Sequence, residues 1–149
     1  MSAPKTILVA TDFSEFSDRA VKEALEMAEN YKSKLIILHV IDENLQQCVV
    51  DYCLSAEAFT ELQEKSEQSS RQKMEEEFRK LSPRKDGNGV AFKVRTGVPY
   101  TEILHEQQED RADLIVLGSH GKRGFIHNML GGVAEKVTRG ASVPVLVVR

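Results

Sequence analysis

Residues 113–121 read Asp-Leu-Ile-Val-Leu-Gly-Ser-His-Gly, an apolar run that leads directly into a glycine-containing loop. The run is almost continuously apolar rather than alternating, which is typical of a strand buried on both faces of a parallel sheet. Four more aliphatic or β-branched runs of strand length occur, at residues 6–10, 34–41, 90–95 and 144–148. We therefore predict five strands, with residues 113–118 as the fourth.

Helical patterns separate these strands, at residues 14–31, 55–81, 98–110 and 129–139. Ser14 or Ser17 is suited to cap the first helix, Pro99 to open the third, and Gly140 to end the last. The second helix has no large apolar residue from 63 to 73, which predicts an exposed or mobile stretch and leaves its continuity open. The alternation of strands and helices predicts an α/β fold, a doubly wound parallel sheet with helices on both faces.

The chain has 149 residues, and we expect one domain over residues 1–149. Its formal net charge of −3 argues against a nucleic-acid-binding protein. No apolar run approaches the roughly 20 residues that cross a bilayer, and the first residues lack a signal-peptide pattern. We therefore expect a cytoplasmic protein without a membrane partner. Cys48 and Cys53 match no redox or zinc motif and are expected to be reduced thiols rather than a regulatory disulfide.

Two loops follow strands at the expected ligand-binding edge of the sheet. Ligands of doubly wound sheets bind at the carboxyl ends of strands, where the winding direction reverses. The first loop is Ala10-Thr11-Asp12-Phe13-Ser14, and the second, 118–124, is Gly-Ser-His-Gly-Lys-Arg-Gly. Residues 119–139 hold four Lys and Arg residues against one Glu. Glycine backbone N–H groups and the N-terminus of the following helix favour an anion there, so we expect a phosphate site.

Familiar nucleotide-binding motifs do not fit the second loop. The P-loop pattern requires a glycine five residues before Gly121, and this chain has none there. It also requires Ser or Thr after Lys122, where this chain has Arg123. The dinucleotide pattern G-x-G-x-x-G fails as well. What the sequence contains is Gly118, two residues, Gly121, nine residues, and then Gly131.

Together with four other segments, this loop makes the chain resemble the universal stress protein family. The segments stand in the family's order and spacing over nearly the whole chain. They are 7–14 (ILVATDFS), 38–40 (LHV), 97–99 (Gly-x-Pro), 113–121 (DLIVLGSHG) and 144–148 (PVLVV). The resemblance implies an adenine nucleotide alpha hydrolase-like fold, with a five-stranded parallel sheet in the order 3-2-1-4-5. The two loops would then face each other.

The resemblance also implies an ATP site, or one for AMP or ADP, with Mg or Mn held by the phosphates. Ala10 and Asp12 would line the pocket, and Val40 would contact the adenine. The residues that would surround the ribose and phosphates are Leu117, Gly118, Gly121, Gly131, Gly132 and Val133. From the residues themselves, Lys122 and Arg123 are expected either to contact phosphates or to remain in solvent.

One position departs from the pattern. Nucleotide-binding members carry Ser or Thr after the glycine that corresponds to Gly131, whereas this chain has Gly132. The missing hydroxyl removes a hydrogen bond to a phosphate oxygen worth on the order of 1.5–3 kcal/mol. Three functions stay open: a nucleotide-binding regulatory module of the stress response, which we favour, an interaction protein without nucleotide, and a slow ATPase. In the second case the glycines would serve only turns and close packing.

Catalytic and metal-binding patterns are sparse. Ser119 beside His120 is not by adjacency a nucleophile and base, and the histidines lack metal-binding spacing. We therefore predict no catalytic residue and no metal site formed by protein side chains. His39 is expected in the core or the pocket wall. Asp12 is the best candidate for a functional carboxylate, with helix capping as its alternative role.

The last strand, from Pro144 to Val148, is expected at an edge of the sheet. Unpaired backbone groups at such an edge can pair with another chain. In the family this edge commonly pairs antiparallel with its own copy, so the resemblance implies a homodimer with a two-fold contact. A further protein partner is expected, but the sequence does not identify it.

Overall fold

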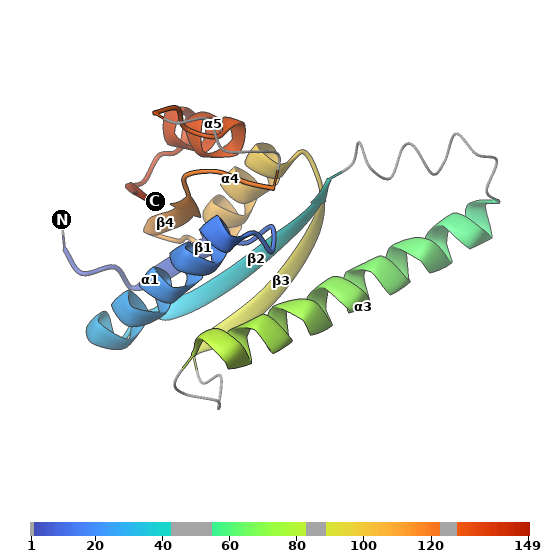
Figure 1. Ribbon diagram of the computed structural model, residues 1–149, viewed down its shortest axis with the longest axis horizontal. Coiled ribbons are helices and arrows are strands. Elements are labelled where there is room, and N and C mark those ends of the chain that lie inside the picture. The colour runs from blue at the N-terminus through green and yellow to red at the C-terminus, as the bar shows by residue number, and fades with distance from the viewer. Residues whose placement is uncertain (1, 43–54, 83–88, 123–127) are drawn as a thin grey trace.

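The structure is a computed structural model that describes residues 2–42, 55–82, 89–122 and 128–149 (Figure 1). Its five strands form one parallel sheet in the order β3-β2-β1-β4-β5. The predicted strand order is therefore confirmed. The strands are β1 (Thr6–Ala10), β2 (Lys34–Asp42), β3 (Val90–Gly97), β4 (Leu114–Gly118) and β5 (Val145–Val148).

Within the described residues, four helices cover the two faces of the sheet (Figure 1). Helices α1 (Glu15–Tyr31) and α3 (Ala56–Leu81) pack on one face, and α4 (Pro99–Glu109) and α5 (Gly132–Gly140) on the other. The central strands contribute alternate residues to the two cores, with Ile7 and Val9 facing α1 and Leu8 facing α4 and α5. Burial on both faces explains why these strands are continuously apolar.

Most predicted boundaries shift by one or two residues. Ser14 caps α1, because its side chain accepts a hydrogen bond from the Ser17 N–H. β4 begins at Leu114 rather than at residue 113, since the Asp113 carboxylate accepts hydrogen bonds from the Lys5 and Thr6 N–H groups, at 2.9 and 3.1 Å. This contact fixes the start of β1 beside the start of β4.

The start of the last helix was predicted three residues too early. The structure has Gly131 as the N-cap and Gly132 as the first helical residue, while Met129 and Leu130 are exposed outside the helix. The Gly131 N–H donates to the carbonyl of Ser119 at 2.7 Å, which holds this residue against the preceding loop. Gly140 was expected to stop the helix, but it is the last helical residue.

Helix α3 is continuous, which the sequence left open. Its two buried residues, Met74 and Phe78, lie in its second half, and the Arg71 guanidinium donates to the Phe92 carbonyl of β3 at 3.1 Å. Its first half extends past the end of the sheet (Figure 1). The predicted exposure of residues 63–73 agrees with this arrangement, because this stretch has no large apolar side chain to pack against the sheet.

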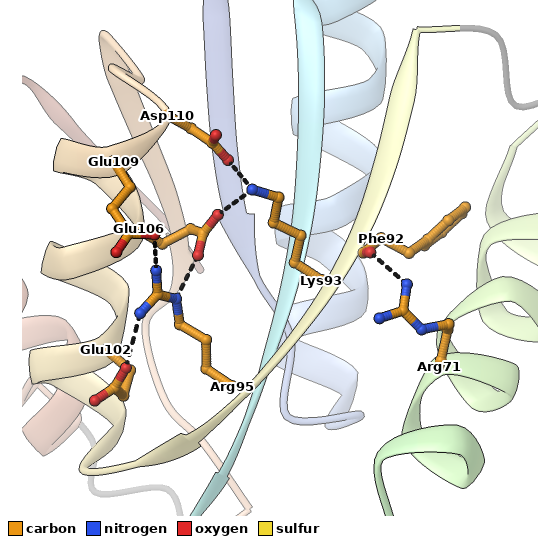
Figure 2. A network of polar contacts seen from close by, with 8 residues as sticks. All are labelled: Arg71, Phe92, Lys93, Arg95, Glu102, Glu106, Glu109 and Asp110. Carbon is orange, nitrogen blue, oxygen red and sulfur yellow. Dashed lines mark hydrogen bonds and ion pairs between the residues drawn. The ribbon is translucent and has the colours of Figure 1, made fainter. Parts of the chain in front are cut away.

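A network of charges joins α4 to the edge strand β3 (Figure 2). Lys93 and Arg95 of β3 face the buried carboxylate of Glu106, which is 2% exposed. Lys93 Nζ lies 2.7 Å from Glu106 Oε1, and Arg95 Nε donates to Glu106 Oε2. Around this centre, Asp110 pairs with Lys93, and Glu102 and Glu109 pair with Arg95. The network holds α4 against β3, an edge strand that pairs with only one neighbouring strand.

Two predictions lie outside the described residues: the state of Cys48 and Cys53, and the position of Arg123. Within the described part of the chain, no helix is long and apolar enough to cross a membrane.

Candidate functional site

The carboxyl ends of three neighbouring strands bring the predicted site residues to one edge of the sheet. β1 pairs with β4 through Val9 and Val116, so Ala10 and Leu117 end side by side. Ala10 pairs with Leu38 of β2, and Val40 follows two residues later on that strand. Ala10 and Val40 pack against the core on the α4 and α5 face, which places them on the same side of the sheet.

Asp12 joins the loop after β1 to the loop after β4. Its Oδ1 accepts from the Ser14 N–H at 3.0 Å, and its Oδ2 accepts from the Lys122 N–H at 2.9 Å. Partial burial by itself would raise the pKa of Asp12, but the hydrogen bonds from Ser14 and Lys122 outweigh it and hold the pKa below its ordinary value. The carboxylate therefore stays ionised at neutral pH. Helix capping, the alternative role for Asp12, belongs to Ser14.

Gly121 lies where the β4 loop approaches the β1 loop closely, and Gly131 lies where the start of α5 approaches the β4 loop closely. A Cβ atom on Gly121 would lie 2.7 Å from Asp12 Oδ2. A Cβ atom on Gly131 would lie 3.1 Å from the carbonyl oxygen of Ser119 and 3.2 Å from the Cα atom of His120. Any side chain at Gly121 would thus displace the carboxylate that links the loops.

Gly118 has a different neighbour. A Cβ atom there would lie 2.9 Å from both the carbonyl carbon and the oxygen of Phe16, in the backbone of α1. Close packing of β4 against α1 therefore accounts for this glycine without a ligand. For this one residue the structure agrees with the alternative that loop glycines serve packing.

The N-terminus of α5 points its free N–H groups into this region without a side-chain cap. The first N–H groups of a helix have no intrahelical acceptor, and the helix dipole adds partial positive charge. Gly132 and Val133 in this turn are exposed, and among the described residues no atom outside this helical turn lies within 4 Å of a Cβ built on Gly132. Backbone donors with open space in front of them can bind an oxyanion such as phosphate.

Phe13, which the sequence analysis did not single out, lies beside His39 at this edge. The Phe13 ring lies 4.5 Å from the His39 ring, and His39 Nδ1 donates to the carbonyl of Thr11 at 2.7 Å. Burial lowers the pKa of His39, which keeps the imidazole neutral at pH 7. His39 therefore forms part of the wall beside the first loop, one of the two places that the sequence suggested for it.

The side chains of Ser119 and His120 contact each other, which their adjacency in the sequence did not by itself predict. Ser119 Oγ lies 2.9 Å from His120 Nδ1, and Ser119 is 2% exposed. The His120 ring packs against Phe16 of α1 at 5.2 Å. The serine hydroxyl is enclosed by the protein, so this pair holds the loop in place rather than facing a substrate. Among the described residues, no three His, Cys, Asp or Glu side chains are grouped as a metal site would require.

Sequence comparison identifies relatives over the full length of the chain. The model of the Universal stress protein family matches residues 4–149. The universal stress protein MJ0577 of Methanocaldococcus jannaschii is 32% identical over 153 residues, which cover 97% of this chain and 94% of the relative. The universal stress protein YxiE of Bacillus subtilis is 31% identical over 145 residues, covering 96% and 97% of the two chains.

Solved structures agree with these relatives. The structure of MJ0577 superposes with a TM-score of 0.74 at 33% identity, covering 97% of this chain and 94% of that one. Two other universal stress protein structures contain a nucleotide. One is in complex with cAMP (TM-score 0.66, 23% identity, 99% and 98% coverage), and one from Archaeoglobus fulgidus is in complex with dAMP (TM-score 0.57, 21% identity, 97% of each chain).

Proposed function

The chain belongs to the universal stress protein family, and from this we propose that it is a regulatory module that binds an adenine nucleotide at the carboxyl edge of β1 and β4. One observation carries the proposal: the uncapped N-terminus of α5 lies against the loop after β4, with Gly131 N–H bound to the Ser119 carbonyl. Among the described residues, the next N–H groups of this turn have no side-chain acceptor. The structures of universal stress proteins in complex with cAMP and with dAMP support an adenine nucleotide as the ligand.

In this proposal each loop has a separate task. The β1 loop and Val40 surround the base and ribose, and Asp12 holds the β4 loop at the correct distance through the Lys122 N–H. The first turn of α5 binds phosphate oxygens. Both oxygens of Asp12 already accept backbone hydrogen bonds, so a divalent cation such as Mg or Mn would be coordinated mainly by the phosphates. The proposal assigns no catalytic step to the protein.

Native mass spectrometry of the purified protein, with and without Mg-ATP, tests this function. We expect about one adenine nucleotide per chain, because a ligand that binds only the folded state is retained and stabilises it. The bound mass should remain that of the added nucleotide during incubation. A chain that stays empty at millimolar ATP would contradict the proposal and favour an interaction protein, whereas conversion of bound ATP to ADP would favour a slow ATPase.

Replacing Gly132 by serine should tighten nucleotide binding by about tenfold or more, since a hydrogen bond from a hydroxyl to a charged phosphate adds roughly 1.5–3 kcal/mol. The position has room for the side chain, because no described atom outside this helical turn lies within 4 Å of its Cβ. Isothermal titration calorimetry with ATP measures the change. Gly132→Ala is the matched control, since it alters the helix in the same way without the hydroxyl. Equal affinities of the two variants would place the phosphates away from this turn.

The proposed assembly is a homodimer formed by antiparallel pairing of β5 with its copy. β5 is an edge strand of the sheet, and its residues are half-buried in the single chain. Val147→Lys should convert the dimer to a monomer, because a lysine on this short edge opposes pairing with an identical strand. Sedimentation velocity measures the mass. An unchanged dimer, with an unchanged melting temperature, would show that another surface joins the copies.

A further inference from the structure

The two edge strands of the sheet, β3 and β5, differ in length and in the residues that they carry. β5 has four residues, all apolar and uncharged. β3 has eight residues, among them valine and phenylalanine, and pairs with β2 alone. A long edge strand with such residues is the kind that pairs readily with another chain. We therefore looked for a feature that occupies the open side of β3.

A side chain occupies one backbone carbonyl on this open side. The Leu35 N–H of β2 donates to the Gly89 carbonyl, which therefore points toward β2. Successive carbonyls of an extended strand point to alternate sides, so the Phe92 carbonyl, three residues further, points away from β2. The Arg71 guanidinium of α3 donates to this carbonyl at 3.1 Å (Figure 2). Arg71 thus lies where the backbone of an added strand would have to pair.

The packing of α3 holds Arg71 at this edge. Met74 and Phe78 follow it by about one and two turns on the same face of the helix. Their side chains are 2% and 5% exposed. The Phe78 ring meets the Phe92 ring edge-on, with 5.4 Å between the ring centroids. Because these two residues anchor α3 on the outer part of the sheet, the guanidinium of Arg71 stays beside β3.

The charged side chains of β3 itself point toward α4 rather than past the edge of the sheet. Lys93 and Arg95 pair with the Glu106 carboxylate, on the face of the sheet opposite to α3 (Figure 2). Cationic side chains that extend past an edge strand oppose its pairing with another chain. Lys93 and Arg95 are not placed for this role, whereas Arg71 contacts the edge backbone directly.

We propose that Arg71 prevents a second copy of the chain from adding to the sheet at β3, so that strand pairing between copies is confined to β5. An added strand would have to displace the guanidinium from the Phe92 carbonyl. Copies that pair through both edges form an open-ended stack, whereas copies that pair through one edge close as a dimer. The inference about β3 stands on these contacts, and its consequence for β5 rests on the proposed homodimer.

Sedimentation velocity of the full chain tests this inference, with and without the β5 contact. Val147→Lys combined with Arg71→Met should have about twice the mass of Val147→Lys alone, because the β3 edge then pairs with its copy. Arg71→Met alone should form species larger than the unaltered chain, and their mass should rise with protein concentration. The substitution removes no buried residue, so circular dichroism should show a folded protein.

A further substitution in β3 shows whether this strand makes the new contact. The Thr96 N–H points away from β2 by the same alternation as the Phe92 carbonyl. Proline lacks this donor and is tolerated in edge strands where the N–H faces solvent. Adding Thr96→Pro to Arg71→Met should therefore return the mass to that of the chain with Arg71 intact.

Lys65→Met is the matched control. Lys65 is exposed on α3 and lies on a different face from Arg71, since six residues span about 1.7 turns. Its substitution removes one positive charge and adds the same side chain, and we expect the mass of the unaltered chain. Arg71→Gln, whose polar side chain is too short to span the same distance, is the second variant and takes the place of Arg71→Met if that variant does not fold.

Three results would overturn the inference about β3. They are an unchanged mass in the folded Arg71 variant, an equal increase in Lys65→Met, and an increase that Thr96→Pro does not reverse. An unchanged mass in Val147→Lys would instead contradict the proposed β5 dimer. The two failures are distinguishable, because each Arg71 variant is compared with the same chain that retains Arg71.

Discussion

Glu106→Gln is expected to lower the free energy of unfolding by about 3 kcal/mol. The Glu106 carboxylate is 2% exposed, and each of its oxygens contacts a cation of β3, Lys93 or Arg95. The glutamine amide has nearly the same shape as the carboxylate, so the lower free energy of unfolding comes from the lost negative charge. Two partly buried cations lose their central partner, and one of them then faces the N–H₂ group of the amide. Urea denaturation at neutral pH measures the change.

Glu109→Gln is the control for this prediction. Glu109 contacts the same Arg95 guanidinium, but its side chain is 66% exposed. A solvent-exposed ion pair contributes little, so we expect a loss below about 0.5 kcal/mol. Equal effects of the two substitutions would mean that burial does not set the strength of this network.

Gly118→Val is expected to destabilise the fold by about 3 kcal/mol and to weaken nucleotide binding as a consequence. Any Cβ atom here meets the α1 backbone at Phe16 at 2.9 Å, and neither β4 nor α1 can yield without disturbing the core between them. Thermal unfolding by circular dichroism measures the loss of stability.

Gly132→Ala is the contrasting substitution, because its Cβ enters open space. It should leave the fold at least as stable, since alanine is the better helix former. Full stability of Gly118→Val would require α1 to move away from β4. Because Gly118 supports packing, its substitution is a poor probe of nucleotide contacts, whereas Gly132 is a selective one.

The fold could be predicted because its signals are local and repeated. Continuous apolar runs identified the strands, and the segments shared with the family gave the strand order. The start of the last helix was placed wrongly at Met129 because its apolar side chains fit a helical pattern, whereas the Gly131 N–H binds a carbonyl far back in the chain. A hydrogen bond of that kind leaves no periodic trace in the sequence.

The candidate site was predictable only in part for the same reason. The glycines and Asp12 stood out after strand ends, and the structure brings them together. The contact between Phe13 and His39 did not stand out, because nothing near either residue in the sequence reveals it. The acidic residues of α4 around Glu106 were equally unremarkable until β3 was placed beside them.

The first half of α3, which extends past the sheet, also affects which substitutions the fold tolerates over evolutionary time. The helix is anchored by Met74 and Phe78, while its first half extends beyond the sheet. Substitutions on that half remove little buried surface, so drift there should be nearly neutral for folding. New surface features can therefore accumulate on the first half of α3 while the sheet and its loops stay unchanged. Related chains could therefore come to differ in their protein partners through this half of α3 while the rest of the fold stays the same.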